Sequence, residues 1–167
     1  MRPTIRKPSR NTQVTVSVLD RLLDDRPDET HETRHMSPTD VQAQKRMVAR
    51  DMEHLLNARR PDWQETLAEF PETVSSMFNY GIPDLSGLSL LSPDDRQYLR
   101  ASLEQAISHN EKRLKNVQVI LEVARNLERV LHFRVDAVLE IHPSRPAVVF
   151  DAVLQLNSNV YKVKGEG

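Results

Sequence analysis

The 167-residue chain contains no cysteine, which excludes a disulfide framework, a cysteine-based zinc site and a thiol nucleophile. It has only four glycines, too few to place a glycine-rich phosphate loop easily, and it lacks the P-loop, dinucleotide, GxSxG and HExxH motifs. No apolar run approaches the ~18 residues of a membrane span, and no signal-peptide hydrophobic region follows the N-terminus. We therefore expect a soluble protein that is not obviously secreted, with no cofactor and no metal, and the absence of cysteine fits a cytosolic location.

The chain also lacks an excess of either charge, with 23 Lys and Arg against 24 Asp and Glu. This balance removes the general electrostatic argument for binding nucleic acid or an anionic membrane. Hydrophobic residues make up 38% of the chain and aromatic residues 5%, against a usual apolar content of about 45–50%. The core should therefore be aliphatic and modest, with ordered structure concentrated in part of the chain.

The N-terminal 36 residues are interpreted as an arm, a short helix and a linker. Residues 1–17 carry four basic and no acidic side chains, so they form either a solvated tail or an arm that becomes ordered on a partner. Residues 17–25 contain one apolar stripe of a two-turn helix, formed by Val18, Leu19, Leu22 and Leu23. Two turns are not stable alone, so this stripe must pack on the domain or on a partner.

Two longer amphipathic helices are predicted within a domain at residues 37–158. The first spans about 39–58, with Ser37 or Thr39 as its N-cap. The second begins with Ser92 as N-cap, a proline at the first helical position and two aspartates in the first turn. It runs to about His109, and its apolar face consists of Leu99, Leu103, Ala106 and Ile107.

Between these helices, residues 62–92 combine large apolar side chains with prolines and glycines. This composition predicts short helical turns around 64–68 and 72–78, followed by a structured loop. The apolar side chains of such a loop must be buried, either in the core or in an interface.

Beyond residue 110 the apolar periodicity changes from 3.6 to 2, which predicts strands over about 117–123, 131–141 and 148–156. Three consecutive strands with short connections form an antiparallel meander with one face against the helices. We therefore predict an α+β fold of two main helices on a three-stranded sheet. Residues 159–167 are interpreted as a C-terminal tail that either pairs with the sheet or stays free for a partner, because an exposed sheet edge can accept a strand.

No catalytic constellation emerges from the sequence. Glu111, Glu122 and Glu140 are the only carboxylates placed where a glycosidase-type pair could form. The last two alternate with core positions of strands, as do His132 and His142, so we expect these four side chains to be solvated.

Four stretches together resemble one family, the E subunit of the type VI secretion baseplate, TssE. Residues 17–22 read SVLDRL, similar to the family's sLLdRL, and residues 48–60 read VARDMEHLLNARR, close to RDLExLLNTRR. Residues 78–85 read FNYGIPDL, which resembles NYGxPDL, and residues 110–114 read NEKRL where the family has EPRL. Lys112 therefore replaces the family's proline, and we expect a softer connection there.

The resemblance implies a non-enzymatic subunit of the cytoplasmic baseplate wedge, similar to the "lysozyme-like" wedge protein of contractile phage tails. It implies partners of the F, G and K type, and a sheet that templates the first ring of B- and C-type sheath proteins by strand exchange. It also implies that Glu111 and Arg113 contact neighbouring subunits. The partner-binding residues we predict are Glu111, Arg113, Leu114, Leu19, Arg21, Leu22, Val160 and Tyr161.

Two other functions stay open. A peptidoglycan-cleaving enzyme would need two carboxylates in a cleft, one of them with a raised pKa. A generic adaptor would bind one partner without depending on sheath proteins. The baseplate hypothesis further predicts that replacing Glu111 or Arg113 by alanine weakens wedge assembly. The free energy of unfolding should fall by no more than about 1 kcal/mol, as for surface sites.

Overall fold

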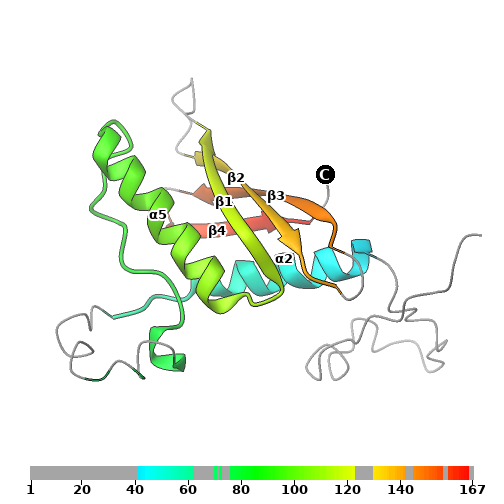
Figure 1. Ribbon diagram of the computed structural model, residues 1–167. Helices are drawn as coiled ribbons and strands as arrows, with labels where there is room; N and C mark the ends of the chain where they lie inside the picture. The colour runs from blue at the N-terminus through cyan, green and yellow to red at the C-terminus, as the bar shows by residue number, and fades with distance from the viewer. Residues whose placement is uncertain are drawn as a thin grey trace, which may run out of the picture.

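The computed structural model describes residues 41–61, 70, 72, 76–122, 130–141, 145–155 and 158–165. Two helices lie on one face of a four-stranded antiparallel sheet (Figure 1), which confirms the predicted α+β class. The elements in chain order are α2 (Val41–Asn57), the 3-10 turn η1 (Met77–Asn79), α5 (Pro93–Asn110), β1 (Leu114–Glu122), β2 (Val130–Leu139), β3 (Ala147–Gln155) and β4 (Val160–Lys164).

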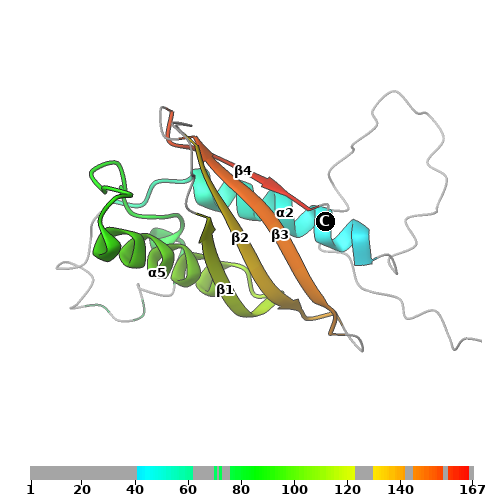
Figure 2. The ribbon, with the colours of Figure 1, turned by 90° about the horizontal axis from the view of Figure 1, so that it is seen from above.

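The sheet order is β1-β2-β3-β4, so every strand pairs with its neighbour in sequence. Helix α5 contacts β1 at one side of the sheet, and α2 contacts β4 at the other (Figure 2). A helix therefore lies beside each edge strand of the sheet, and it limits how far the outer backbone groups of that strand are exposed to solvent.

The local sequence signals explain the limits of α5. The Ser92 side chain accepts a hydrogen bond from the Asp95 backbone N–H at 3.3 Å, and Pro93 occupies the first turn, as predicted. The predicted apolar face is confirmed, because all its members are buried: Leu99, Leu103, Ala106 and Ile107.

The predicted first helix is also confirmed within the described residues, over Val41–Asn57. Its inward side chains recur at helical spacing, and Val48, Met52 and Leu55 are each at most 2% exposed. The proposed caps Ser37 and Thr39 lie outside the described residues, as do the arm, the short helix at 17–25, the linker and the predicted turns at 64–68.

Strand β1 begins at Leu114, three residues before the predicted start. Its pairing register with β2 shifts between Lys115 and Gln118, and Asn116 adopts a positive φ of 54°. This bulge resets the alternation, so that Leu114 and Val119 both point into the core although they are five positions apart.

The prediction of three strands is wrong, because residues 160–164 form a fourth strand that pairs with β3. Asn159 precedes it with a φ of 51°, a left-handed conformation that asparagine tolerates better than most residues. Of the two alternatives for residues 159–167, pairing with the sheet is therefore the one observed, and the sheet extends past residue 158.

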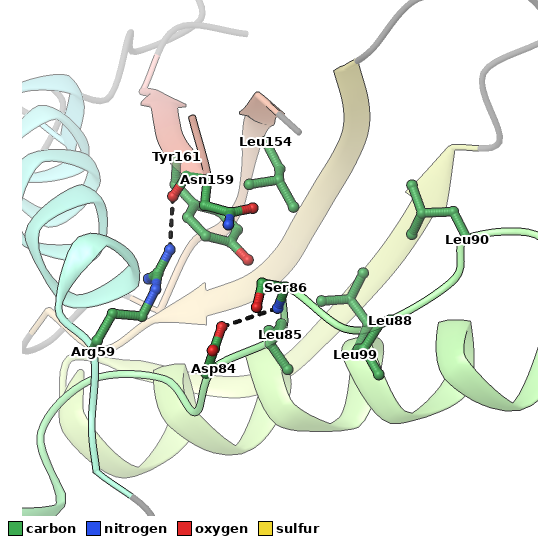
Figure 3. A pocket seen from close by; sticks show the side chains of 10 residues that line it. All are labelled: Arg59, Asp84, Leu85, Ser86, Leu88, Leu90, Leu99, Leu154, Asn159 and Tyr161. Carbon is green, nitrogen blue, oxygen red and sulfur yellow. Dashed lines mark hydrogen bonds between the residues drawn. The ribbon is translucent and has the colours of Figure 1, made fainter. Parts of the chain in front are cut away.

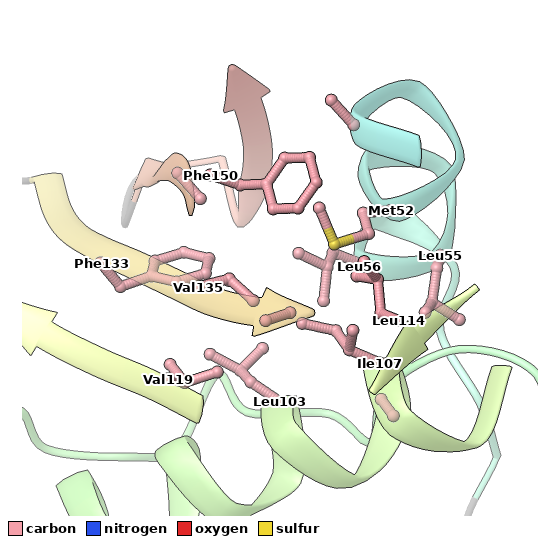
Figure 4. Packing of buried hydrophobic residues seen from close by; sticks show 14 of the residues in the cluster. Met52, Leu55, Leu56, Leu103, Ile107, Leu114, Val119, Phe133, Val135 and Phe150 are labelled. Carbon is pink, nitrogen blue, oxygen red and sulfur yellow. The ribbon is translucent and has the colours of Figure 1, made fainter. Parts of the chain in front are cut away.

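The hydrophobic core lies between the sheet and the two helices (Figure 4). Leu103 and Ile107 of α5 and Met52 of α2 point toward the aromatic and branched side chains of the strands. The Phe133 and Tyr161 rings meet edge to face with centroids 6.1 Å apart, so β4 contributes a large buried side chain to the core.

Candidate functional site

The stretches at 48–60, 78–85 and 110–114, which were singled out in the sequence, come together at one junction. The loop around Ile82 runs beside the end of α2 in a short parallel bridge with Arg59. Ile82 N–H donates to the Ala58 carbonyl at 3.0 Å, and Arg60 N–H donates to the Ile82 carbonyl at 2.9 Å. Because the Ile82 side chain is fully buried, this bridge anchors the loop on the core.

Gly81 permits this close approach. Its φ is +107°, and a Cβ at this position would lie 2.6 Å from the Ala58 carbonyl oxygen. The neighbouring Asn79 side chain accepts a hydrogen bond from Arg60. The glycine and the asparagine of the NYG sequence thus both serve to attach the loop to α2.

The third stretch joins the junction through an ion cluster. Arg113 Nε donates to Glu111 Oε1 at 2.8 Å, while its Nη2 lies 2.5 Å from Asp51 Oδ2 and also bonds Glu111. Asp51 in turn accepts two hydrogen bonds from Arg50. The Arg113 guanidinium therefore lies between two carboxylates from different elements, Asp51 of α2 and Glu111 at the end of α5.

The cluster stabilises the arginine charge. Burial alone would lower the pKa of Arg113, but hydrogen bonds and charge interactions with Glu111 and then Asp51 outweigh burial and raise it. The pKa of Tyr80 is also raised, first by burial and then by the negative charges of Asp51 and Glu111. Tyr80 therefore belongs to the electrostatic surroundings of the cluster.

Glu111 holds the connection between α5 and β1 where we expected Lys112 to soften it. Its backbone N–H donates to the Ile107 carbonyl at 2.8 Å, and its carboxylate accepts from the Arg113 backbone N–H at 3.1 Å. Leu114 N–H donates to the Glu111 carbonyl at 3.2 Å. These bonds fix the connection in place of a proline, and Lys112 itself is exposed.

A pocket of about 270 Å³ lies beyond the junction, between the loop after Ile82, the start of α5 and the β3–β4 turn (Figure 3). Five of its ten lining residues are leucines, and Arg59 and Asp84 also line it. Arg59 donates to the Asn159 carbonyl at 2.7 Å, and the Ser86 backbone N–H, 3.0 Å from the Asp84 carboxylate, lowers the pKa of Asp84. Both charged side chains are thus already engaged within the chain.

The predicted partner-binding residues differ in accessibility. Arg113 has a side chain 30% exposed, and Val160 is half-buried. Three others are buried: Glu111, Leu114 and Tyr161 are 7%, 2% and 1% exposed. The expectation that Glu111 is a surface site is therefore wrong, because the helix end turns its carboxylate inward toward Arg113. Leu19, Arg21 and Leu22 lie outside the described residues.

The sequence interpretation missed Asp51 and Tyr80. Asp51 lies within the RDMEHLLN stretch and Tyr80 within NYGIPDL. Their position in stretches that resemble the family was the signal that could have marked them as site residues. Pairing across 62 positions, as between Asp51 and Arg113, leaves no pattern that a single sequence reveals.

The other candidate side chains are placed as solvated groups. Glu122, Glu140 and His132 are exposed, and Glu140 forms ion pairs with Lys115 at 3.8 Å and Arg145 at 3.0 Å. His142 lies outside the described residues. Within the part of the chain that is described, no three His, Asp or Glu side chains gather as a metal site, and no helix is long and apolar enough to cross a membrane.

Together, the fold and the junction define a small α+β domain in which charged and turn residues of three separated motifs fasten its parts to one another. The family model for the baseplate wedge protein gp25 matches residues 42–144, and the chain belongs to this family. This is the family of TssE, the type VI baseplate wedge subunit. Comparison with curated proteins gave no match, and neither did comparison with solved structures. Family membership supports a structural role like that of a phage baseplate component, which assembles with other baseplate proteins.

Proposed function

We propose that this chain is a non-enzymatic subunit of a type VI secretion baseplate wedge. It helps to assemble the baseplate from F-, G- and K-type subunits on the cytoplasmic side of the machine. Its sheet templates the first ring of the contractile sheath, built from B- and C-type proteins, by strand exchange. The family match and the residues that resemble TssE support this proposal.

The observation that carries the proposal is the way the junction presents Arg113. Two carboxylates hold the guanidinium in a fixed position, yet the Arg113 and Asp51 side chains remain 30% exposed, and Lys112 beside them is exposed. A preorganised arginine loses little conformational freedom on binding, and arginines are frequent anchors of protein interfaces. The α5–β1 connection thus offers a rigid charged surface to a neighbouring subunit.

Among the described residues, Asp51 and Glu111 form a carboxylate pair that the lysozyme-like alternative could use. The guanidinium of Arg113 lies between these carboxylates and bonds both, in the space where a glycosidic bond would have to enter. This arrangement favours a structural ion cluster over a general acid and its partner.

Affinity purification of the tagged chain from its own host tests the proposal. We expect F-, G- and K-type subunits and sheath proteins to be recovered at fixed ratios. A single partner, retained in cells that lack the sheath proteins, would indicate the adaptor. Recovery of the chain alone while baseplates are assembled would reject the baseplate role, and release of fragments from purified peptidoglycan would indicate the enzyme.

A further inference from the structure

The pocket beside the β3–β4 turn is lined largely by apolar side chains. Three of its leucines are half-buried on the loop before α5: Leu85, Leu88 and Leu90. The rest of its apolar surface comes from side chains that are buried (Figure 3): Leu99, Leu154 and Tyr161. Contact of water with these leucines is unfavourable, so an apolar occupant would be stabilised in the pocket.

The size of the pocket indicates protein side chains as its occupant. Its volume is about 270 Å³, below the roughly 300–1,000 Å³ of most small-molecule sites. A cavity of about 150 Å³ binds one benzene-sized group, so this pocket has room for about two leucine-sized side chains. These dimensions favour an apolar segment of a protein over a cofactor.

One segment of the chain needs such a site. The sequence predicts a two-turn helix over residues 17–25, which lie outside the described residues, and its apolar stripe consists of Val18, Leu19, Leu22 and Leu23. A helix of two turns is not stable in water unless its apolar face is packed. The stripe and the pocket are therefore matched in chemistry.

The charges that accompany the stripe and the pocket are also complementary. Arg26 follows Leu22 by four positions and Leu23 by three, so at helical spacing it lies on the same face as the stripe. Asp84 lines the pocket, is exposed and accepts a hydrogen bond from Ser86 N–H at 3.0 Å. A carboxylate has about four acceptor positions, so Asp84 can also accept from a guanidinium.

The chain between the stripe and the pocket is long enough to join them. Helix α2 begins at Val41, and Arg59 just after its end lines the pocket. The helix has 17 residues and therefore spans about 25 Å at 1.5 Å per residue. The 14 residues from 27 to 40 extend to at most about 45–50 Å, so residues 17–26 can reach the pocket of their own chain.

We propose that the pocket binds the apolar stripe of residues 17–25 of the same chain, with Arg26 paired to Asp84. Leu19 and Leu22, which we predicted to bind a partner, then pack within the chain. Arg21 lies on another face of the predicted helix and stays available to a neighbouring subunit. This inference does not depend on the proposed function.

Cysteine cross-linking in the full chain tests the proposal, because the chain has no cysteine of its own. Under mild oxidation, Leu22→Cys with Ser86→Cys should form an intramolecular disulfide at least about tenfold faster than Leu22→Cys with Ser108→Cys. The control is matched because Ser86 and Ser108 are both exposed serines, and Ser108 lies nine residues beyond Leu99 on α5, about 14 Å along the helix. Equal rates for the two pairs would overturn the proposal.

A mixture of the two single variants distinguishes the same chain from a second copy. Leu22→Cys mixed with Ser86→Cys should give almost no disulfide-linked dimer in the time that the double variant needs to cross-link. Formation of the mixed dimer as fast as the intramolecular disulfide would show that a second copy occupies the pocket, and it would overturn the proposal.

Charge reversal tests the pairing of Arg26 with Asp84. In the double-cysteine chain, either Arg26→Glu or Asp84→Lys should slow the cross-link between positions 22 and 86 about two- to threefold, as for an exposed ion pair. The two reversals together should restore the original rate. A rate that stays low when both charges are reversed would contradict the pairing.

Hydrogen exchange provides a readout that needs no cysteine. In the original chain, the amides of residues 21–24 should exchange more slowly than those of an unstructured peptide, because packing holds the helix together. Asp84→Lys should make them exchange faster. Exchange of these amides in the original chain at the rate of an unstructured peptide would overturn the proposal.

Discussion

Gly81 lies so close to Ala58 that a Cβ on the glycine would stand 2.6 Å from the alanine carbonyl oxygen. The contact joins the loop that carries NYGIPDL to the end of the helix that carries RDMEHLLNARR. The same helix binds Arg113 through Asp51 and covers β4 through Asn57. One helix thus fastens three distant parts of the chain, which explains why residues that look like a binding motif hold the fold together.

Replacing Gly81 by alanine should lower the free energy of unfolding by about 2–4 kcal/mol, because the new Cβ meets backbone atoms and a φ of +107° is strained for alanine. Gly87→Ala is the matched control, since nothing lies within 4 Å of its Cβ position, and it should change stability by no more than about 0.5 kcal/mol. Urea unfolding measures both. Equal midpoints for the two variants would show that the loop does not depend on this contact.

Glu111→Ala should cost about 2 kcal/mol of stability, more than a surface site, because Glu111 is 7% exposed and bonds both the backbone and the side chain of Arg113. Glu111→Gln keeps the shape and an acceptor, so it should cost less. Chemical denaturation of both variants checks the order. A loss below about 0.5 kcal/mol for the alanine variant would contradict the structural role of the ion cluster.

Stability should fall at alkaline pH through Tyr161. Burial raises its pKa to about 12 from 10.0, so the folded chain retains a proton that the unfolded chain releases. This contribution is fully present below about pH 10 and is lost as pH rises through about 12, for a total of about 2–3 kcal/mol. Urea midpoints of the original chain and Tyr161→Phe, measured across this range, should diverge. The raised pKa of Tyr80 acts in the same direction, so Tyr80→Phe serves as the second comparison. Parallel pH curves for the original chain and Tyr161→Phe would contradict this assignment.

Deletion of residues 1–16 should reduce partner binding more than thermal stability. The segment is basic, contains no acidic residue and precedes the apolar stripe at 17–25, so its sequence predicts little contribution to a core. Calorimetry and pull-down of the deleted chain make the comparison. A large drop in the melting temperature would show that the arm is part of the domain.

The helices and the longer strands could be predicted because each carries its pattern within a few residues, as Ser92-Pro93 and the alternating stretch around Phe133 show. For strand β4 the sequence left two alternatives open, pairing with the sheet or a free tail, because five residues with two lysines give a weak period and the pairing depends on the left-handed turn at Asn159. The bulge at Asn116 likewise leaves no mark in the alternation until the register of β2 is known.

The site was harder to predict than the fold. Glu111 and Arg113 were found through resemblance. A charged residue at a helix end is expected to be exposed, and only the structure shows that the Glu111 carboxylate turns inward to bind Arg113. The sequence also predicted an exposed sheet edge. It did not predict that Asn57 bonds the backbone of this edge at Tyr161, because the two residues are 104 positions apart.

The measurement that tests the central claim most directly compares Lys112→Glu with the original chain in the host. Lys112 is exposed beside Arg113, so reversing its charge should leave the melting temperature unchanged while it alters the surface offered to a neighbour. We predict that the tagged variant recovers much less of the F-, G- and K-type baseplate subunits and supports less sheath assembly than the original chain. Recovery of these subunits at the original ratio by Lys112→Glu, and equally by Arg113→Lys, would contradict a baseplate interface at this connection.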